Sequence, residues 1–450
     1  MTSASGTGLR RWLLGAVALF MAAGCDHSSE PVSLPGLAAQ LPRNSDLNVL
    51  VVSFDALRAD ALGLYGYARP TSPNLDRFAR QALVFDNAYT AAPVTPTSFA
   101  AAFTGQYPYR VFLGWQLMPV PTLAGLMQQS GRVTFGLLNN VQLAVERKFD
   151  QGYQTYQAGG VSDRELLTEA EKKLEEVRDR PFFGWVHFIS PHTPYTWREM
   201  ASKLAPRETE GRFAKQVPAN YEVQSDAELA RARQLYDGEI YFVDSLFGQL
   251  MKKLQNLGLA DKTIVVVTAD HGEEFLEHGH LGHKSLYREV VRIPLLIRHP
   301  QVEAGSRTGL PYQNVDLLPT LASIVGLSLP PDLDGRSLLE PVPAERVRVM
   351  AGMTAPERYQ MGLETGGRTL MQLCTPEFQE RLYDLASDPD EQHDLVLDRP
   401  DLAGELADLL KRHTGIEPCQ LIVNSVRGKV PEELLSDEQV EQLKSLGYVQ

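Results

Sequence analysis

The sequence Thr-Ile-Val-Val-Val-Thr-Ala-Asp-His-Gly-Glu, residues 263–273, decides the fold. Its apolar, β-branched run Ile264–Thr268 is typical of a buried strand in a mostly parallel sheet. The run leads into Asp270 and His271, and open α/β sheets bind ligands at the carboxyl ends of their strands. A carboxylate beside an imidazole can hold a divalent cation there, although Asp before Gly is also common as a helix cap. The stretch therefore predicts a strand and leaves the cation and the cap as alternatives.

A second apolar run, Asn48–Asp55, also closes on a carboxylate. In one doubly wound sheet, the strands that end near Asp55 and Asp270 can meet at a single site. Burying both carboxylates without a cation would cost several kcal/mol of desolvation and repulsion. The pair therefore favours ligation of one divalent cation by Asp55, Asp270 and His271 over simple capping.

The composition is that of a soluble globular protein, with 43% apolar and 22% charged residues. A length of 450 residues suggests one large domain with an appendage. The net charge of −13 argues against a nucleic-acid partner, because phosphate contacts need a basic face.

The N-terminus has the pattern of a targeting segment. Two arginines precede the apolar run Trp12–Met21, which is short for a membrane span, and small residues then lead to Cys25. This pattern resembles a bacterial lipobox, so residues 1–25 are expected to be a lipoprotein signal peptide with Cys25 as the lipidation site. Plain secretion with a free Cys25 is the alternative. We expect residues 26–46 to form a flexible tether, and the protein to lie outside the cytoplasm, anchored to the periplasmic face of a bacterial membrane.

The rest of the chain divides by pattern. Alternating strand and helix signals predict a catalytic α/β core of residues 47–341. Shorter strand signals predict a C-terminal subdomain of residues 342–418, followed by a tail of residues 419–450. Cys374 and Cys419 could pair in an oxidising compartment, but their presence alone leaves the pairing open.

Thr95 stands at the expected start of a helix. We predict that Thr95 is the N-cap and Pro96 the first helical residue. Backbone N–H groups and the positive end of the helix dipole would then suit an anion beside Thr95. An ordinary capping Thr is the alternative. Ser98 is the rival hydroxyl, which we expect to bond the backbone of the cap.

Histidines follow two of the expected strands. His192 lies between two prolines after the strand predicted at residues 182–189, on a loop that the prolines stiffen. A packed histidine in a turn is the alternative. Further basic or titratable groups crowd the loop after His271: His278, His280, His283 and Lys284. They suit recognition of an anion and protonation of a leaving group, with a solvated polar loop as the alternative.

Taken together, these residues resemble the sulfatase family of the alkaline-phosphatase superfamily over about residues 48–410. The segments that carry the resemblance are Asn48–Tyr67, Ser72–Tyr107, Pro181–Tyr195, Tyr236–Glu273, His278–Pro294, Asn314–Leu338 and Leu382–Leu395. The resemblance implies an α/β fold, with a large mostly parallel sheet between helices and a small C-terminal α+β subdomain.

The resemblance also assigns roles to single positions. The positions that match metal ligands are Asp55, Asp270 and His271. The positions that match catalytic groups are Thr95 as nucleophile, His192 as the substrate-facing histidine and His278 in the region that supplies a leaving-group acid. Either His278 or His192 would then protonate the departing alcohol. The positions that match substrate-binding groups are Asn139, His283 and Lys284.

Two departures from the family pattern bear on the chemistry. Sulfatases carry Cys or Ser in a Cys-x-Pro-x-Arg pattern and convert it to formylglycine. Here Thr95 holds that position, with Thr97 for the Pro and Phe99 for the Arg, and Thr cannot become formylglycine. Ala56 replaces a second Asp ligand of many sulfatases. Two-metal members need an additional Asp-x-x-x-His set, and Ser190 stands where an Asp would help, which favours one metal over two.

The resemblance implies a metal-dependent hydrolase of sulfate or phosphate esters that uses Thr95 without formylglycine. Its cofactor would be one divalent ion, Ca or Mg ahead of Mn or Zn, and its substrate a small-molecule, glycan or lipid anionic ester. A phosphodiesterase or phosphoethanolamine-type transferase of the same superfamily is an alternative. A catalytically inactive, membrane-anchored binding protein is a second alternative. The leaving group and the oligomeric state are open.

Overall fold

The computed structural model describes residues 41–302, 305–343, 345–355, 358–374, 377–415, 417, 419 and 437–445. The expected signal peptide with Cys25, and most of the expected tether and tail, lie outside these residues. Within the described ranges, no helix is both long and apolar enough to cross a bilayer. The expectations for residues 1–40 stay predictions.

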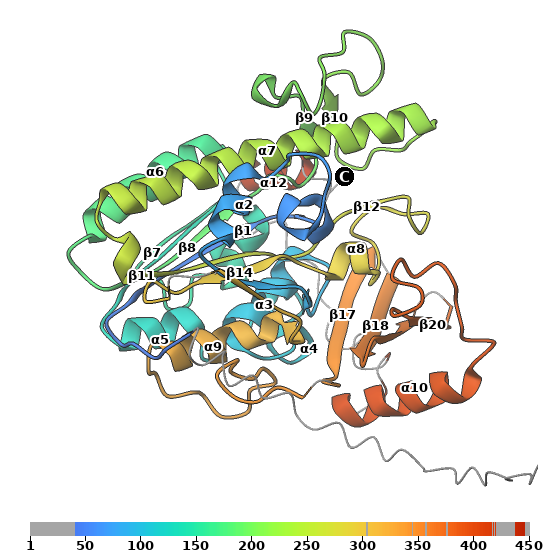
Figure 1. Cartoon of the computed structure of the whole chain (residues 1–450). Coiled ribbons are helices and arrows are strands. Elements are labelled where there is room, and N and C mark those ends of the chain that lie inside the picture. The colour runs from blue at the N-terminus through green and yellow to red at the C-terminus, as the bar shows by residue number, and fades with distance from the viewer. Residues whose placement is uncertain are drawn as a thin grey trace, which may run out of the picture. The chain divides into compact units, whose positions relative to one another are not determined.

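An eight-stranded sheet lies at the centre of the described chain (Figure 1). Its strands are β1 (Asn48–Phe54), β2 (Leu83–Phe85), β6 (Val133–Leu138), β7 (Thr155–Ala158), β8 (Phe182–Phe188), β11 (Thr263–Ala269), β14 (Leu295–Arg298) and β15 (Ser306–Thr308). They are ordered β15-β2-β14-β11-β1-β8-β6-β7. Only β14 runs antiparallel to its neighbours among these strands, so the sheet is mostly parallel, as the sequence predicts.

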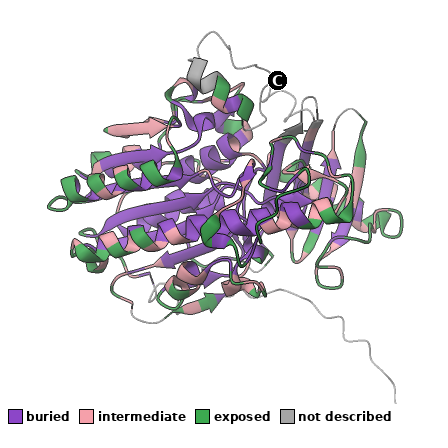
Figure 2. Cartoon of the chain, turned by 90° about the horizontal axis from the view of Figure 1, so that it is seen from above, coloured by how far each residue is buried: buried purple, intermediate pink, exposed green. Residues whose placement is uncertain are grey.

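Helices cover both faces of this sheet (Figure 1). The helices of one layer are α2 (Pro73–Ala79), α6 (Asp163–Val177) and α7 (Asp226–Asn256). Those of the other layer are α3 (Thr95–Thr104), α5 (Leu123–Gln129) and α9 (Leu317–Ile324). Every residue of β1, β8 and β11 is buried, and Figure 2 shows exposed residues on the outer sides of the helices. Strands covered on both faces need apolar side chains on both, which is why β1 and β11 read as continuous apolar runs.

Smaller elements complete the described chain. The other helices are α4 (Pro108–Val111), α8 (Arg288–Val291), α10 (Pro400–Thr414) and α12 (Asp437–Ser445). The 3-10 turns are η1 (Ala59–Ala61), η2 (Gly63–Tyr65), η3 (Val141–Leu143), η4 (Val145–Arg147), η5 (Glu199–Ala201), η6 (Ala260–Lys262) and η7 (Asn314–Asp316). The short strands are β3 (Ala88–Tyr89), β4 (Phe112–Leu113), β5 (Gln116–Leu117), β9 (Tyr195–Thr196), β10 (Gln216–Val217), β12 (Glu274–Phe275), β13 (Leu281–Gly282) and β16 (Tyr312–Gln313).

A buried carboxylate on α7 caps α2 from a distance. The side chain of Ser72, at the N-cap of α2, makes no capping hydrogen bond. Instead Asp244 accepts hydrogen bonds from the backbone N–H groups of Asn74 and Leu75, at 3.0 and 2.8 Å, and from Asn74 Nδ2 at 2.8 Å. These donors belong to the first turn of α2, where helix N–H groups have no partner within the helix. Asp244 therefore joins two helices of the same layer.

The C-terminal part forms a second, antiparallel sheet. Its strands are β17 (Arg348–Ala355), β18 (Arg358–Thr365), β19 (Arg368–Leu373) and β20 (Gln379–Asp384), paired in that order. Leu363, Leu370 and Leu406 of this part share one apolar cluster with Ala101 and Val315 of the core. The expected C-terminal sheet is present, and it packs on the core. Its boundaries at residues 342 and 418 stay predictions.

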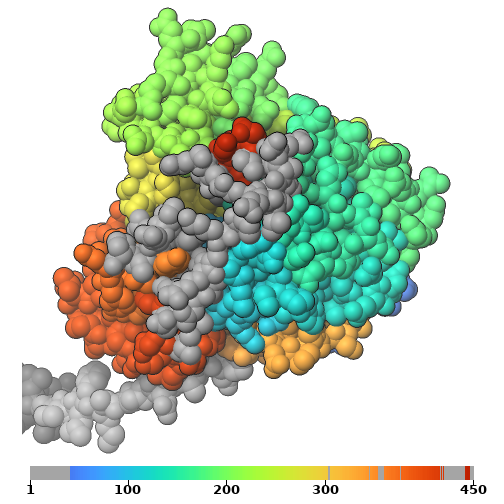
Figure 3. All heavy atoms as spheres, turned by 180° about the vertical axis from the view of Figure 1, so that it is seen from behind, coloured from blue at the N-terminus to red at the C-terminus, as the bar shows by residue number. Residues whose placement is uncertain are grey.

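Two further contacts tie the end of the chain down. Cys374 and Cys419, whose pairing the sequence leaves open, form a disulfide. Leu443 of α12 packs against Val141 and Ala144, and Figure 3 shows α12 in red between the green and cyan segments. A segment more than 290 residues downstream thus covers the turn that follows β6.

Candidate active site and metal centre

The register of β1 and β11 brings two carboxylates together. These strands pair in parallel up to Phe54 and Ala269, so Asp55 and Asp270 leave the same edge side by side. Ligand atoms of Asp55, Asp270 and His271 all lie within 4.8 Å of one another, and all three residues are fully buried. The structure therefore brings together the three residues that the two strand ends predict as ligands, and their role as ligands stays a prediction.

The atoms at the centre of this set fit a cation. Asp55 Oδ1 and Asp270 Oδ2 are buried and have no hydrogen-bond partner. His271 Nδ1 donates to the carbonyl of Gly272 at 2.9 Å, which leaves the Nε2 lone pair facing the carboxylates. His271 Nε2 lies 3.4 Å from Asp270 Oδ2 and 3.8 Å from Asp55 Oδ1. Because buried carboxylate oxygens without donors are costly, these three atoms suit ligation of a divalent ion.

The second oxygen of Asp55 is held by two groups that the sequence analysis missed. Asn140 Nδ2 donates to Asp55 Oδ2 at 2.5 Å, and the backbone N–H of Gln142 fixes the amide by donating to Asn140 Oδ1 at 2.8 Å. His187 Nε2 lies 3.3 Å from the same carboxylate oxygen. The sequence signal for His187 is its position as a histidine within an apolar strand. No feature of the sequence shows that Asn140 rather than Asn139 contacts Asp55.

A hydrogen-bond chain orients His187. Trp185 Nε1, which can only donate, donates to Ser53 Oγ at 2.8 Å. Ser53 Oγ lies 3.0 Å from His187 Nδ1, which can accept the hydroxyl proton. In this tautomer Nε2 carries the ring proton and donates it to Asp55 Oδ2. The chain leaves Asp55 Oδ1 as the oxygen turned toward the metal centre.

Backbone amides hold the other carboxylate. Asp270 Oδ1 accepts hydrogen bonds from the N–H of Ala56 at 3.1 Å and from the N–H of His271 at 2.8 Å. Ala56 has a φ of 55°, in the left-handed region that residues other than glycine rarely adopt. This backbone turn aims the Ala56 amide at Asp270, and its methyl side chain supplies no ligand.

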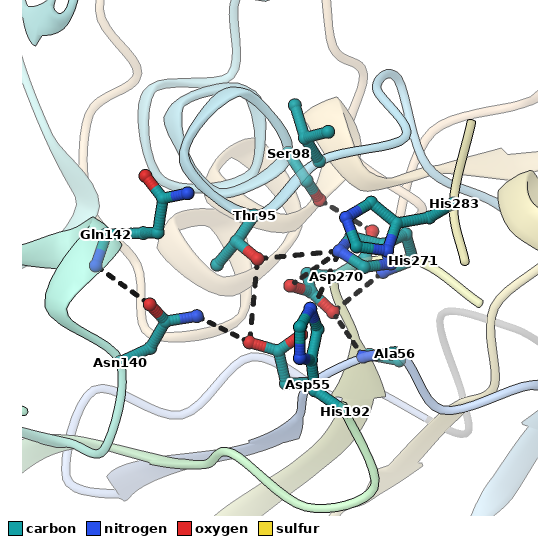
Figure 4. Close-up of polar contacts among 12 residues, drawn as sticks. Asp55, Ala56, Thr95, Ser98, Asn140, Gln142, His192, Asp270, His271 and His283 are labelled. Atoms are coloured by element: carbon teal, nitrogen blue, oxygen red, sulfur yellow. Dashed lines mark hydrogen bonds and ion pairs between the residues drawn. The ribbon is translucent and has the colours of Figure 1, made fainter. Parts of the chain in front are cut away.

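Thr95 lies beside the metal centre in the first turn of α3 (Figure 4). Its Oγ1 lies 3.5 Å from Asp55 Oδ2 and 3.4 Å from His271 Nε2. The predicted cap assignment is wrong by one residue. Val94 is the N-cap, Thr95 is the first helical residue, and Pro96 is the second. Because the hydroxyl of Thr95 caps nothing, it is available to face the carboxylates.

Ser98 has a structural position instead. Its hydroxyl donates to the carbonyl of Asp270 at 2.8 Å and accepts from Asn314 Nδ2 at 3.0 Å. The expected bond from Ser98 to the backbone of the cap is therefore replaced by a bond to the metal loop. Ser98 supports Asp270 from behind, while Thr95 faces the centre.

Two further histidines line the site. The rings of His283 and His271 lie 4.2 Å apart between centroids, and those of His283 and His192 lie 5.3 Å apart (Figure 4). His192 Nδ1 donates to the carbonyl of Thr193 at 2.7 Å, so Nε2 points away from that carbonyl. Glu273, 1% exposed, lies near this group, with Oε1 3.8 Å from His283 Nδ1. The sequence analysis did not single out Glu273.

Burial and charge set the protonation of these groups. Burial raises the pKa of Asp55, but His192, His187 and His271 outweigh it and hold that pKa well below its usual range. Burial, and then Asp55, raise the pKa of Asp270. The pKa values of the two carboxylates are thus shifted in opposite directions, as expected when like charges share a buried site without a cation.

The pKa values of the three histidines also shift in different directions. Burial lowers the pKa of His271, which keeps it neutral as a ligand must be. Burial, and then His192, lower the pKa of His283 to about 3. Burial lowers the pKa of His192, but Asp55 and Glu273 raise it more, and the net shift is upward. Burial raises the pKa of Glu273 to about 7. His192 is therefore the member of this group best able to carry a proton.

Three predicted site residues are placed differently. Asn139 Nδ2 donates to Asp163 Oδ1 at 2.9 Å, away from the carboxylate that Asn140 contacts. Lys284 has an exposed position, and its backbone N–H donates to Glu274 Oε2 at 3.1 Å. The ring of His278 stacks on Tyr287, with centroids 3.5 Å apart, rather than joining the rings of His192, His271 and His283. Their roles in substrate binding and catalysis stay predictions.

Comparisons with known proteins find two family models that match this chain. The sequence model of the family Sulfatase matches residues 47–327, and that of N-sulphoglucosamine sulphohydrolase, C-terminal, matches residues 276–414. An ulvan-active sulfatase of Formosa agariphila is 26% identical, covering 65% of this chain and 64% of that protein. A Delta 4,5-hexuronate-2-O-sulfatase of Bacteroides thetaiotaomicron is 24% identical, covering 82% of this chain and 88% of that protein.

A solved structure supports the fold. The crystal structure of the phosphonate monoester hydrolase of Agrobacterium radiobacter has a TM-score of 0.70 and 20% identity to this chain. The match covers 82% of this chain and 95% of that one. The chain spans 64% of the length of the ulvan-active sulfatase and 36% of the length of a mouse arylsulfatase K that is 29% identical over 42% of this chain.

Proposed function

Because the chain belongs to the sulfatase family, we propose that it is a metal-dependent hydrolase of sulfate or phosphate esters with Thr95 as its nucleophile, without formylglycine. The observation that carries the proposal is the position of Thr95 Oγ1, 3.5 Å from Asp55 Oδ2 and 3.4 Å from His271 Nε2. No capping bond competes for this hydroxyl, since Val94 is the cap. The hydroxyl therefore borders the metal centre from the first turn of a helix, where an anion is stabilised.

The proposed reaction has two steps. Thr95 Oγ gives up its proton to solvent and attacks the sulfur or phosphorus atom, and the bond from that atom to the alcohol oxygen breaks as His192 protonates the departing alcohol. Water then gives a proton back to His192 and attacks the same atom, and the bond from that atom to Thr95 Oγ breaks as Thr95 regains a proton from solvent. When bound, a divalent cation would act as a Lewis acid that favours the alkoxide of Thr95 and neutralises the anionic ester.

The leaving alcohol needs a proton, and His192 is placed to give it. His192 is buried at the site, its Nδ1 is held by the carbonyl of Thr193, and nearby carboxylates raise its pKa. His283 stacks against His271 with a lowered pKa, which favours an uncharged role in substrate binding. We therefore assign proton donation to His192 rather than to His278.

The donor set bears on the metal. Two carboxylate oxygens and the imidazole nitrogen of His271 face the centre. Carboxylate oxygens suit calcium, magnesium and manganese, whereas imidazole suits zinc. The imidazole therefore moves Zn²⁺ ahead of the Ca²⁺ or Mg²⁺ expected from the sequence, and the carboxylates also accept Mn²⁺.

The nucleophile also bears on the ester. A sulfate carried on a formylglycine hydrate can be eliminated from a geminal diol, whereas an ester of Thr95 must be hydrolysed or transferred. This requirement favours phosphorus over sulfur, and it keeps a phosphodiesterase or a phosphoethanolamine-type transferase as the second candidate. Anchoring through Cys25 at a periplasmic membrane face would bring a lipid or glycan ester within reach and is part of the proposal.

A panel of nitrophenyl sulfate, phosphate, phosphodiester and phosphonate esters tests the proposal, each with Zn²⁺, Mn²⁺, Mg²⁺ and Ca²⁺. We expect turnover of at least one ester, loss of turnover after chelation, and recovery with Zn²⁺ or Mn²⁺. The matched control is Asp270→Asn, which should lose both metal and turnover. If the wild-type protein binds metal but turns over no ester, including with an alcohol acceptor present, the inactive binding protein replaces the hydrolase.

A further inference from the structure

We propose that His278, Glu289 and Glu391 form a second divalent-cation site, where the catalytic core meets the C-terminal sheet. The proposal does not depend on the proposed function, because none of these residues belongs to the Asp55 cluster. It gives a role to His278, which the sequence singled out and the catalytic site does not use.

The geometry fits a cation. Ligand atoms of the three residues all lie within 4.8 Å of one another. His278 Nε2 lies 3.5 Å from Glu289 Oε1. Two ligands about 2.1 Å from a tetrahedral ion are about 3.4 Å apart, so this pair already has the spacing of one coordination edge. Small rotations of the Glu391 side chain would close the set.

Unpartnered buried atoms point into the cluster independently of this spacing. The side chain of His278 is 6% exposed, and its Nε2 has no hydrogen-bond partner. The side chain of Glu289 is 10% exposed, and its Oε2 also has no partner. A buried imidazole nitrogen and a buried carboxylate oxygen are costly to leave unpaired, and a shared cation would satisfy both.

The local charge also calls for a cation. Across the described ranges, no Lys or Arg forms an ion pair with Glu289 or Glu391. Glu391 is 3% exposed, and its Oε2 accepts only the backbone N–H of Arg288, at 2.8 Å. Its φ of 52° lies in the left-handed region, which a glutamate adopts rarely. The backbone thus turns a second carboxylate inward beside Glu289, where the charge of Arg288 acts on it without forming an ion pair.

The site would join three elements. His278 lies on the loop between β12 and β13, which leads to His283, and Glu289 belongs to α8. Glu391 follows β20, and Figure 1 shows α8 between β12 and the C-terminal sheet. A pocket of about 600 Å³ is lined by His278, Glu391 and Asp394 among others and gives an ion a route from solvent. The cation would act as a structural clamp, best supplied by Zn²⁺ because one donor is imidazole.

Metal content after Zn²⁺ loading and desalting tests the clamp, in the full chain. We expect two zinc ions per chain in the wild type, one in Glu391→Gln, one in Asp270→Asn and none in the double variant. Glu380→Gln is the matched control, since Glu380 lines the same pocket but is not in the cluster, and it should keep two. Two ions in Glu391→Gln would overturn the clamp, whereas two ions in Asp270→Asn would overturn the catalytic metal site alone.

Anomalous diffraction from zinc-soaked wild-type crystals needs no variant and therefore decides the matter if Glu391→Gln fails to fold. We expect a zinc peak about 2.0–2.2 Å from His278 Nε2 and from oxygens of Glu289 and Glu391. A peak at Asp55 and Asp270 with none at His278 would overturn the proposal. In the Asp270→Asn background, zinc should also raise Tm, and Glu391→Gln should abolish that rise; an equal rise in the double variant would contradict the clamp.

Discussion

Asn140 Nδ2 donates to Asp55 Oδ2 at 2.5 Å, whereas the adjacent Asn139 turns away and donates to Asp163. The two asparagines are chemically identical neighbours that follow one strand. Of the two, only Asn140 contacts a carboxylate of the candidate metal centre. The contact holds one oxygen of Asp55 so that the other faces His271 and Asp270.

Asn140→Ala should therefore weaken metal binding about 10- to 100-fold, as expected when a group that orients a ligand is removed. Asn139→Ala is the matched control and should bind the metal as the wild type does. Titration calorimetry with Zn²⁺ measures both. Equal loss in the two variants would mean that this contact does not organise the site.

Thr95→Ala should lower turnover by several orders of magnitude while metal content and melting temperature stay near those of the wild type. The hydroxyl caps no helix, so its removal costs little stability. Thr95→Ser keeps the hydroxyl and should retain measurable turnover. Ser98→Ala should instead lower stability, because Ser98 bonds the carbonyl of Asp270 and Asn314. Full activity in Thr95→Ala would show that Thr95 is not the nucleophile.

His192→Ala should slow hydrolysis of alkyl esters about 100-fold or more but affect nitrophenyl esters far less. Protonation of the leaving oxygen matters when the alcohol is a poor leaving group and little when it is a good one. The ratio of kcat/KM for the two esters reports this difference. His278→Ala is the comparison and should leave the ratio unchanged. A shifted ratio in His278→Ala alone would identify His278, rather than His192, as the proton donor.

The pH dependence of stability tests Asp244. Burial raises its pKa in the folded protein from 3.8 to about 6, despite the N–H groups of α2 that it accepts. The unfolded chain loses this proton first, so folding stability falls as the pH rises from about 4 to about 6 and stays lower above that. The effect is up to about 3 kcal/mol for two pKa units.

Asp244→Asn cannot titrate at this position, so between pH 4 and pH 7 the wild type should lose up to about 3 kcal/mol of unfolding free energy relative to the variant. Other buried acids contribute equally to both proteins and cancel in the difference. Urea denaturation at the two pH values provides the measurement. Parallel pH profiles for the two proteins would show that Asp244 is ionised in the fold throughout.

Much of the fold was predictable because its inner strands are unambiguous. β1 and β11 are buried on both faces, and their apolar runs end at Asp55 and Asp270. Parallel pairing then requires the two carboxylates to meet. The sequence did not reveal the antiparallel β14, because an apolar run carries no mark of direction.

The side-chain partners of the site were less predictable. Asn140 and Asn139 differ only in where the turn after β6 points each amide, and that is set by tertiary packing. Thr95 was displaced by one residue from its expected cap position because Thr and Pro fit either the cap or the first turn. His278 was grouped with His283 by spacing along the loop, but the β12–β13 hairpin sends the two side chains to different neighbours.

The most direct test of the central claim is mass spectrometry of the zinc- or manganese-loaded protein after acid quenching during turnover of the best ester in the panel. The account predicts a sulfuryl or phosphoryl group on the peptide that contains Thr95, and fragmentation that places it on the Thr95 side chain. The adduct should be absent from Thr95→Ala and from wild-type protein that is quenched in the same way without substrate. An adduct on Ser98 or a histidine, with Thr95 unmodified throughout, would contradict the account.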